Sequence, residues 1–184
     1  MNGDEKMANR LQKLLYYLSA GAPILIVFAI TWLIKNNTMI VSIQGILCSL
    51  SVAFALGIIV LFALSFNFAK NNLSHISVKA VSVRNNDGWI GVYVISYFLP
   101  IPATTINEIV PSVMIIVIIL LMLALTFTDH ITPHPYLFFR GYHFYEVSIE
   151  AAQDNLTLAS KQRIRKPADI HNVYRMFELF LINM

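Results

Sequence analysis

Residues 45–69 read GILCSLSVAFALGIIVLFALSFNFA and contain no charged side chain. They form the apolar part of a longer uncharged stretch, residues 36–69. A helix needs roughly 20 apolar residues to cross a hydrocarbon layer about 30 Å thick. The segment is therefore predicted to be a membrane-spanning helix.

Three further stretches also lack charge, namely residues 14–34, 88–107 and 109–128. Over the whole chain only 12% of residues are charged and 57% are apolar, whereas soluble domains carry about 25% charged residues. This composition excludes a solvated disordered chain and disfavours an ordinary soluble enzyme. Burial of all four segments in a soluble core would leave nothing to cover them. We predict an all-α bundle of four transmembrane helices near residues 14–34, 45–69, 89–106 and 109–128.

The third predicted span is the weakest, because Pro100 and Pro102 interrupt it and each removes a backbone donor. A re-entrant third segment is the alternative. Lys and Arg concentrate in cytoplasmic flanks, and four crossings with both termini inside place 12 of the 13 basic residues there. A re-entrant segment would export the six basic residues of the tail, so four spans are preferred. The first segment exceeds the usual apolar length of a signal peptide and is predicted to remain as an anchor.

The polar remainder is predicted to form a small cytoplasmic β-rich unit from the loop 70–88 and the tail 129–184. Residues 141–149 and 155–164 are strand-like, and residues 150–154 suit a hairpin connection. A lone hairpin is marginally stable, so the alternating segment 74–84 is expected to join it. Asp169 is a candidate cap of a short helix, and residues 178–182 suit a further strand. The division is thus a transmembrane region, residues 1–128, followed by the tail.

Catalytic and metal sites are not indicated. The predicted spans contain no ionisable residue, which argues against proton-coupled transport. No common hydrolase, zinc-protease or nucleotide-binding motif is present. His130 and His134 with Asp129 contain metal-binding groups, but the neighbouring prolines oppose a regular helical face. We expect no enzyme activity, no cofactor and no metal, and the single cysteine, Cys48, implies no disulfide.

A stripe of small residues recurs at every fourth position of the second span. Its members are Gly45, Ser49, Ala53 and Gly57. Small residues let helices approach closely in lipid, where little hydrophobic force acts between them. The stripe suits packing either within one subunit's bundle or between subunits of an oligomer.

A second candidate binding feature is the basic group in the tail, made of Lys161, Arg163, Arg165 and Lys166. On a strand, alternate residues 161, 163 and 165 would share one face. The group suits a solvated face that helps to retain the tail inside, an acidic protein partner, lipid phosphates or nucleic acid. Direct nucleic-acid binding is the least favoured of these and is not expected.

Three segments carry a family resemblance: SYFLPIP (96–102), PHPYLFFRGYHFYEV (133–147) and LTLASKQRIR (156–165). With the four-span layout, they resemble the KwaA family, the membrane components of bacterial Kiwa antiphage defence systems. The resemblance implies a protein of the bacterial inner membrane that forms homo-oligomers, expected to be tetramers. It also implies a sensor of infection that recruits KwaB, a soluble DNA-binding effector. A membrane-permeabilising effector or channel is the alternative function.

Overall fold

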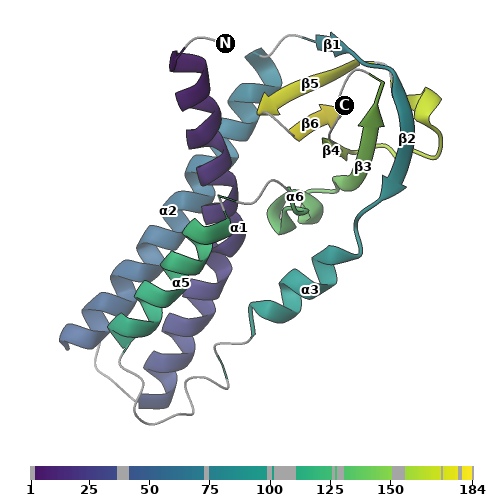
Figure 1. The fold of residues 1–184 in the computed structure, drawn as a ribbon. Helices are drawn as coiled ribbons and strands as arrows, with labels where there is room; N and C mark the ends of the chain where they lie inside the picture. The colour runs from purple at the N-terminus through teal and green to yellow at the C-terminus, as the bar shows by residue number, and fades with distance from the viewer. Residues whose placement is uncertain are drawn as a thin grey trace. The chain divides into compact units, whose positions relative to one another are not determined.

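The structure is a computed structural model that describes residues 3–36, 42–72, 75–98, 101, 111–125, 127, 131–150, 156–170, 172–177 and 180–183. The chain divides into two compact units (Figure 1). The helical unit contains residues 14–63 and 93–127. The sheet unit contains residues 1–13, 64–92 and 128–184.

Two long apolar helices dominate the helical unit. They are α1 (Gly3–Asn36) and α2 (Ile43–Asn72), which are long and apolar enough to cross a membrane. The first turns of α1 and the last turns of α2 belong to the sheet unit. The shorter helix α5 (Pro111–Leu125) packs with them. The buried core of this unit is drawn from all three helices and includes Leu25, Phe28, Trp32, Cys48, Ala55, Ile118 and Met122.

The middle of α1 makes two close contacts within the helical unit. A Cβ atom on Gly21 would lie 2.8 Å from both Cγ and Cε of Met122 on α5, so only glycine fits without movement. The hydroxyl of Tyr97 donates to the backbone carbonyl of Ala20 at 2.7 Å. Both contacts lie within three residues of Pro23, which cannot donate to the helix ladder.

The predicted all-α bundle of four transmembrane helices is wrong. The third predicted span holds helix α3 (Trp89–Ser96), only eight residues long. It ends at Ser96, four residues before Pro100 in the sequence. The fourth contains α5, whose 15 residues extend about 22 Å, short of the roughly 30 Å hydrocarbon layer. The predicted turn at 107–108 lies outside the described residues.

The sheet unit contains a six-stranded sheet rather than a small β appendage. Its strand order is β1-β5-β6-β4-β3-β2. All neighbouring strands are antiparallel except β4 and β6, which are parallel. The strands are β1 (His75–Ser77), β2 (Ala80–Asn85), β3 (His143–Ile149), β4 (Leu156–Ser160), β5 (Asn172–Phe177) and β6 (Phe180–Asn183).

The connection between β1 and β2 forces the sheet to curl. These strands occupy opposite edges of the sheet, yet only Val78 and Lys79 separate them in sequence. The edges of a flat six-stranded sheet would lie about 24 Å apart, whereas the three Cα steps from Ser77 to Ala80 span at most about 11 Å. The sheet therefore bends round until its edges approach each other, as Figure 1 shows.

The enclosed side of the curled sheet is filled by apolar side chains. Tyr145 lies opposite Leu158, which in turn lies opposite Leu181. Ile164 and Ile170, from the segments after β4, complete this core. All five residues of β4 are buried, which identifies it as the central strand with both faces covered.

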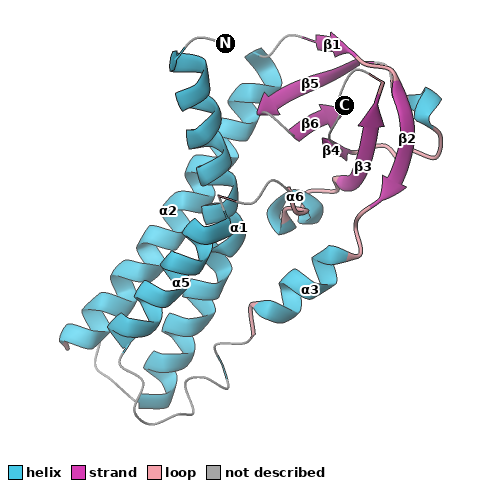
Figure 2. Cartoon of the chain, in the orientation of Figure 1, coloured by secondary structure: helices cyan, strands magenta, loops and turns pink. Residues whose placement is uncertain are grey.

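The strand predictions succeeded in part. The segment 74–84 does pair with the tail hairpin, through β2 and β3 (Figure 2), and residues 180–183 form a strand. The strand predicted over 155–164 ends at Ser160. Asp169 is the last residue of the short 3₁₀ helix η1 (Pro167–Asp169), and it caps this helix from that position, because its carboxylate accepts from the backbone N–H of the N-cap residue Lys166. The parallel pairing of β4 and β6 joins segments distant in sequence, and no local pattern signals it.

The contact between Gly21 and Met122 predicts a non-additive pair of substitutions. Gly21→Ala should destabilise the protein, because overpacking of a close contact costs about 1–3 kcal/mol. In a Met122→Ala background the added methyl group has room, so the same change should become neutral or stabilising. Thermal unfolding of the detergent-solubilised protein measures both effects.

Gly91→Ala on α3 is the matched control for this cycle, since nothing outside its own helix lies within 4 Å of a Cβ at that position. Alanine favours helix over glycine by about 1 kcal/mol, so this variant should be no less stable than the wild type. Equal effects of Gly21→Ala in the two backgrounds would contradict the close approach of α1 and α5.

Candidate functional site

The four basic residues named from the sequence lie in a loop, not on a strand. We call residues 161–166 the basic loop. It begins directly after β4, where the Ser160 hydroxyl accepts a hydrogen bond from the backbone N–H of Gln162 at 3.1 Å. The members Lys161, Arg163, Arg165 and Lys166 are all exposed. The predicted row on one strand face is therefore wrong, although all four charges face solvent.

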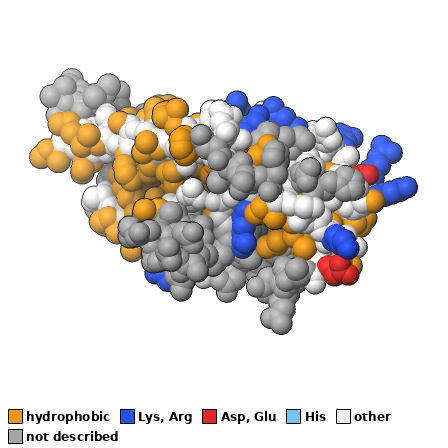
Figure 3. Space-filling model, turned by 90° about the horizontal axis from the view of Figure 1, so that it is seen from above, with side chains coloured by type: hydrophobic (Ala, Val, Ile, Leu, Met, Phe, Trp, Pro, Cys, Tyr) orange, Lys and Arg blue, Asp and Glu red, His pale blue; other side chains and the backbone are white. Residues whose placement is uncertain are grey.

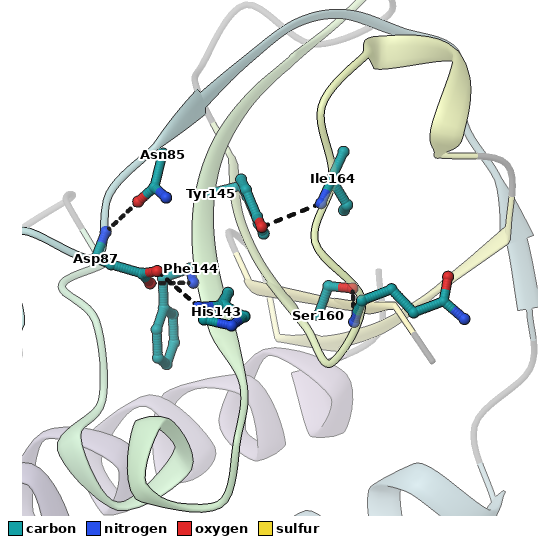
Figure 4. Close-up of polar contacts among 8 residues, drawn as sticks. Asn85, Asp87, His143, Phe144, Tyr145, Ser160 and Ile164 are labelled. Carbon is teal, nitrogen blue, oxygen red and sulfur yellow. Dashed lines mark hydrogen bonds and ion pairs between the residues drawn. The ribbon is translucent and has the colours of Figure 1, made fainter.

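A buried isoleucine holds the middle of the basic loop. Ile164 packs into the enclosed core of the sheet, and its backbone N–H donates to the hydroxyl of Tyr145 on β3 at 3.1 Å (Figure 4). Because Ile164 turns inward, its neighbours Arg163 and Arg165 remain outside. Their exposure thus arises from one anchored residue and not from the pleat of a strand.

Asp169 holds the end of the basic loop. Its Oδ2 atom accepts hydrogen bonds from the backbone N–H groups of Arg165 and Lys166, at 3.2 and 3.0 Å. The carboxylate is thus used to fix the backbone. No acidic side chain among the described residues forms a salt bridge with Arg163, Arg165 or Lys166. The loop presents three ordered cationic groups that are available to an anionic partner.

The fourth basic residue, Lys161, is partly engaged within the sheet unit. Its ammonium group lies 5.4 Å from the centroid of the Tyr142 ring, within the range of a cation–π interaction. Burial raises the pKa of the Tyr142 hydroxyl, against the lowering effect of Arg140, so the ring stays neutral at physiological pH. Phe66 packs edge-on against the same ring. Lys161 is therefore the least available of the four charges.

An open hollow of about 400 Å³ lies next to the end of the basic loop. Pro167 and Ala168, which follow Lys166 directly, form part of its wall. Lys79, in the short connection between β1 and β2, and Glu150 supply its charged groups. Figure 3 shows blue Lys and Arg side chains at several places on the drawn face, with fewer red acidic side chains among the coloured residues. Loop and hollow together make a surface suited to an acidic protein segment.

The small-residue stripe of α2 is only partly covered within its own chain. Gly45 is buried, and Ser49 is half-buried with its hydroxyl donating to the Gly45 carbonyl at 2.9 Å. Ala53 and Gly57 are exposed. The stripe thus has a covered first half and an open second half, and its role between subunits stays a prediction.

Sequence reasoning missed a polar cluster at the start of β3. The carboxylate of Asp87 accepts from the backbone N–H of Phe144 at 2.7 Å and lies 2.8 Å from Nδ1 of His143 (Figure 4). Asn85 accepts from the Asp87 backbone N–H at 2.8 Å. The turn-forming run NNDG (85–88) was the available signal. The contacts described for His143 include no hydroxyl or thiol, so the cluster reads as a structural clamp.

Of the two histidines considered as metal ligands, only His134 lies in the described part of the chain. His134 is buried and caps α6 (Pro135–Phe139), where its Nδ1 atom accepts from the backbone N–H of Tyr136 at 3.2 Å. Asp129 and His130 lie outside the described residues. Within the described ranges, no three His, Cys, Asp or Glu side chains gather as metal ligands would.

The comparison with protein families gives the identity of the chain. A family model described as "Anti-phage protein KwaA" matches residues 12–182. The chain belongs to this family. The match spans both units and confirms the resemblance seen in the sequence, and with it a role in defence against phage. No curated protein sequence matches the chain, and no solved structure matches it.

The anchoring of the basic loop predicts a local change in Tyr145→Phe. This variant removes the acceptor of the Ile164 N–H and leaves a buried donor unsatisfied, at a cost of about 1–3 kcal/mol. Amide hydrogen exchange should accelerate in residues 161–166. Tyr136→Phe is the control, because its hydroxyl accepts an exposed hydrogen bond from Arg140, which lies outside the basic loop. Unchanged exchange in the basic loop of Tyr145→Phe would refute the anchoring role.

Proposed function

We propose that the chain is a non-enzymatic membrane scaffold and infection sensor that forms oligomers and recruits a soluble partner through the basic loop. Membership of the anti-phage family supports the defence context. The observation that carries the proposal is the ordered loop, whose three cationic side chains face solvent and are not engaged by acidic groups of the described chain. Because the loop backbone is already held in place, binding of an anionic partner loses little conformational entropy there.

The distribution of charge supports a protein of the bacterial inner membrane whose sheet unit lies in the cytoplasm. The sheet unit holds 12 of the 13 Lys and Arg residues, and the helical unit holds only Lys35. Basic residues near membrane spans concentrate on the cytoplasmic side. With α1 and α2 as the spans, the N-terminal turns of α1 and the C-terminal turns of α2 both belong to the sheet unit. Both termini are then cytoplasmic.

Strand pairing within the sheet determines on which side of the membrane residues 86–142 begin and end. Since β2 pairs with β3, Asn85 and Tyr145 lie on the same side of the membrane. Residues 86–142, including α3 and α5, therefore begin and end on that side. Under this proposal every strand, and the basic loop, lies in the compartment of the soluble effector.

The partner is an acidic surface of a soluble protein, which the family resemblance implies to be KwaB. Charge complementarity between such surfaces increases the association rate and excludes wrong partners. Direct nucleic-acid binding is disfavoured, because three ordered cations form a small footprint compared with the 6–10 phosphate contacts typical of salt-dependent DNA binding. Contact with DNA is assigned to the partner instead.

Charge reversal tests the recruitment site. Arg163→Glu with Arg165→Glu should abolish co-purification of the partner and abolish phage protection, while the amount of protein in the membrane fraction stays unchanged. The control is Arg10→Glu with Arg140→Glu, which reverses the same charge at exposed arginines elsewhere in the sheet unit. The control should retain the partner. Full partner recovery by the loop variant would remove the basic loop as the site.

The open half of the small-residue stripe is proposed as the contact between subunits. Ala53→Leu with Gly57→Leu should block close helix approach and convert the expected tetramer to smaller species in native mass spectrometry. Leu47→Phe, on an exposed position of the same helix that is not part of the stripe, is the control and should leave the oligomer intact. An unchanged oligomer in the double variant would show that the stripe is not at the interface.

A further inference from the structure

A cavity of about 290 Å³ lies against the outer side of β3 and β4, within the sheet unit. Its floor includes Glu146 and Thr157, which lie directly opposite each other on the two strands. Asn86, Trp89 and Thr132 contribute to its walls. The size approaches the roughly 300–1,000 Å³ range of small-molecule sites. None of these residues belongs to the basic loop or to the small-residue stripe.

Separate hydrogen bonds fix the two walls of this cavity. Thr157 donates its hydroxyl to the backbone carbonyl of Ile131 at 3.0 Å, which ties the segment before α6 to the sheet. On the other side, the Asn86 N–H donates to the Phe144 carbonyl at 2.9 Å. The clamp between Asp87 and the start of β3 holds the same turn. Trp89 follows two residues later, so the cavity is preorganised rather than a gap between mobile loops.

The residues that line the cavity favour a cationic ligand. Among the described residues that line the cavity, only Glu146 is charged, and its carboxylate repels an anionic ligand. The indole of Trp89 is 56% exposed and offers the aromatic face that best attracts an ammonium group. Two threonine hydroxyls and the Asn86 amide add hydrogen-bond acceptors. A primary ammonium donates three hydrogen bonds and can use these acceptors, whereas a quaternary ammonium donates none.

An adjacent arginine supplies the complementary charge. Arg84 on β2 lies directly opposite Glu146 on β3, and such pairs place their side chains on the same sheet face, with Cβ atoms about 5 Å apart. Arg84 is exposed. A carboxylate and a guanidinium side by side match a zwitterion whose ammonium and phosphate are joined by a short linker. Arginine also binds phosphate oxygens in a bidentate manner.

The position of the cavity along the chain identifies the source of this zwitterion. Trp89 lies four residues before the chain enters the helical unit at residue 93, and Thr132 lies five residues after it leaves at residue 127. Tryptophan is enriched at the headgroup level of membranes. We propose that the cavity binds the headgroup of phosphatidylethanolamine, with the ammonium between Glu146 and Trp89 and the phosphate on Arg84. This assignment rests on the proposed membrane anchoring.

Fluorescence of Trp89 tests the assignment. In a Trp32→Phe background Trp89 is the single tryptophan, and short-chain phosphatidylethanolamine added to the detergent-solubilised protein should change its emission in a saturable manner. Phosphatidylcholine should bind more weakly, and phosphatidylglycerol should give no saturable change. Glu146→Gln should lower the affinity for phosphatidylethanolamine about tenfold, the effect of losing one charge-assisted hydrogen bond. Glu150→Gln, a matched change outside this cavity, should leave it unaltered.

Lipid retention by the otherwise wild-type protein in native mass spectrometry provides a second readout that does not depend on Trp32→Phe. Equal retention of the three lipids, or unchanged affinity in Glu146→Gln, would overturn the assignment. Membrane fractionation is measured separately. If the chain binds phosphatidylethanolamine selectively but is not retained in membranes, the anchoring is refuted and the headgroup site stands. If the chain is retained in membranes but shows no lipid preference, only the headgroup site is refuted.

Discussion

The two-residue connection between β1 and β2 constrains the rest of the sheet unit. Because these strands form opposite edges of the sheet, the short link closes the sheet on itself and creates an enclosed side. That enclosed side needs apolar filling, which the strands supply together with Ile164 and Ile170 from outside them. The inward position of Ile164 then decides that its charged neighbours face solvent. The candidate recruitment surface is thus a consequence of how the sheet closes.

The sequence predicts the parts of this fold that depend on local pattern. Absence of charge identifies α1 and α2, and alternation identifies the hairpin of β3 and β4 with β2 beside it. The failures share a physical cause, since apolar composition was treated as sufficient for a membrane span. The third and fourth segments are as apolar as the first two, but α3 has only eight residues and α5 only 15. Hydropathy alone therefore did not predict the length of these helices.

For the candidate site too, composition was predictable from the sequence and geometry was not. The four basic residues and their solvent exposure were predictable from charge density, but their backbone was not, because a strand pattern and a loop anchored by one isoleucine both alternate. The hydrogen bond from Ile164 to Tyr145 links residues 19 positions apart and has no local signature. The cavity beside Trp89 could not be predicted for the same reason, since its lining comes from four separate stretches of the chain.

The sheet is assembled from segments on both sides of the helical unit. Strands β1 and β2 are synthesised before α3 and α5, whereas the partners that cover them, β5 and β3, follow. The first two strands must therefore wait, with unpaired edges, until the later helices have been made and the chain has returned. Completion of the sheet becomes a checkpoint in biogenesis, because a chain in which α5 is misplaced cannot complete the sheet. Such a chain would keep exposed strand edges, the feature by which quality-control proteases and chaperones recognise incomplete products.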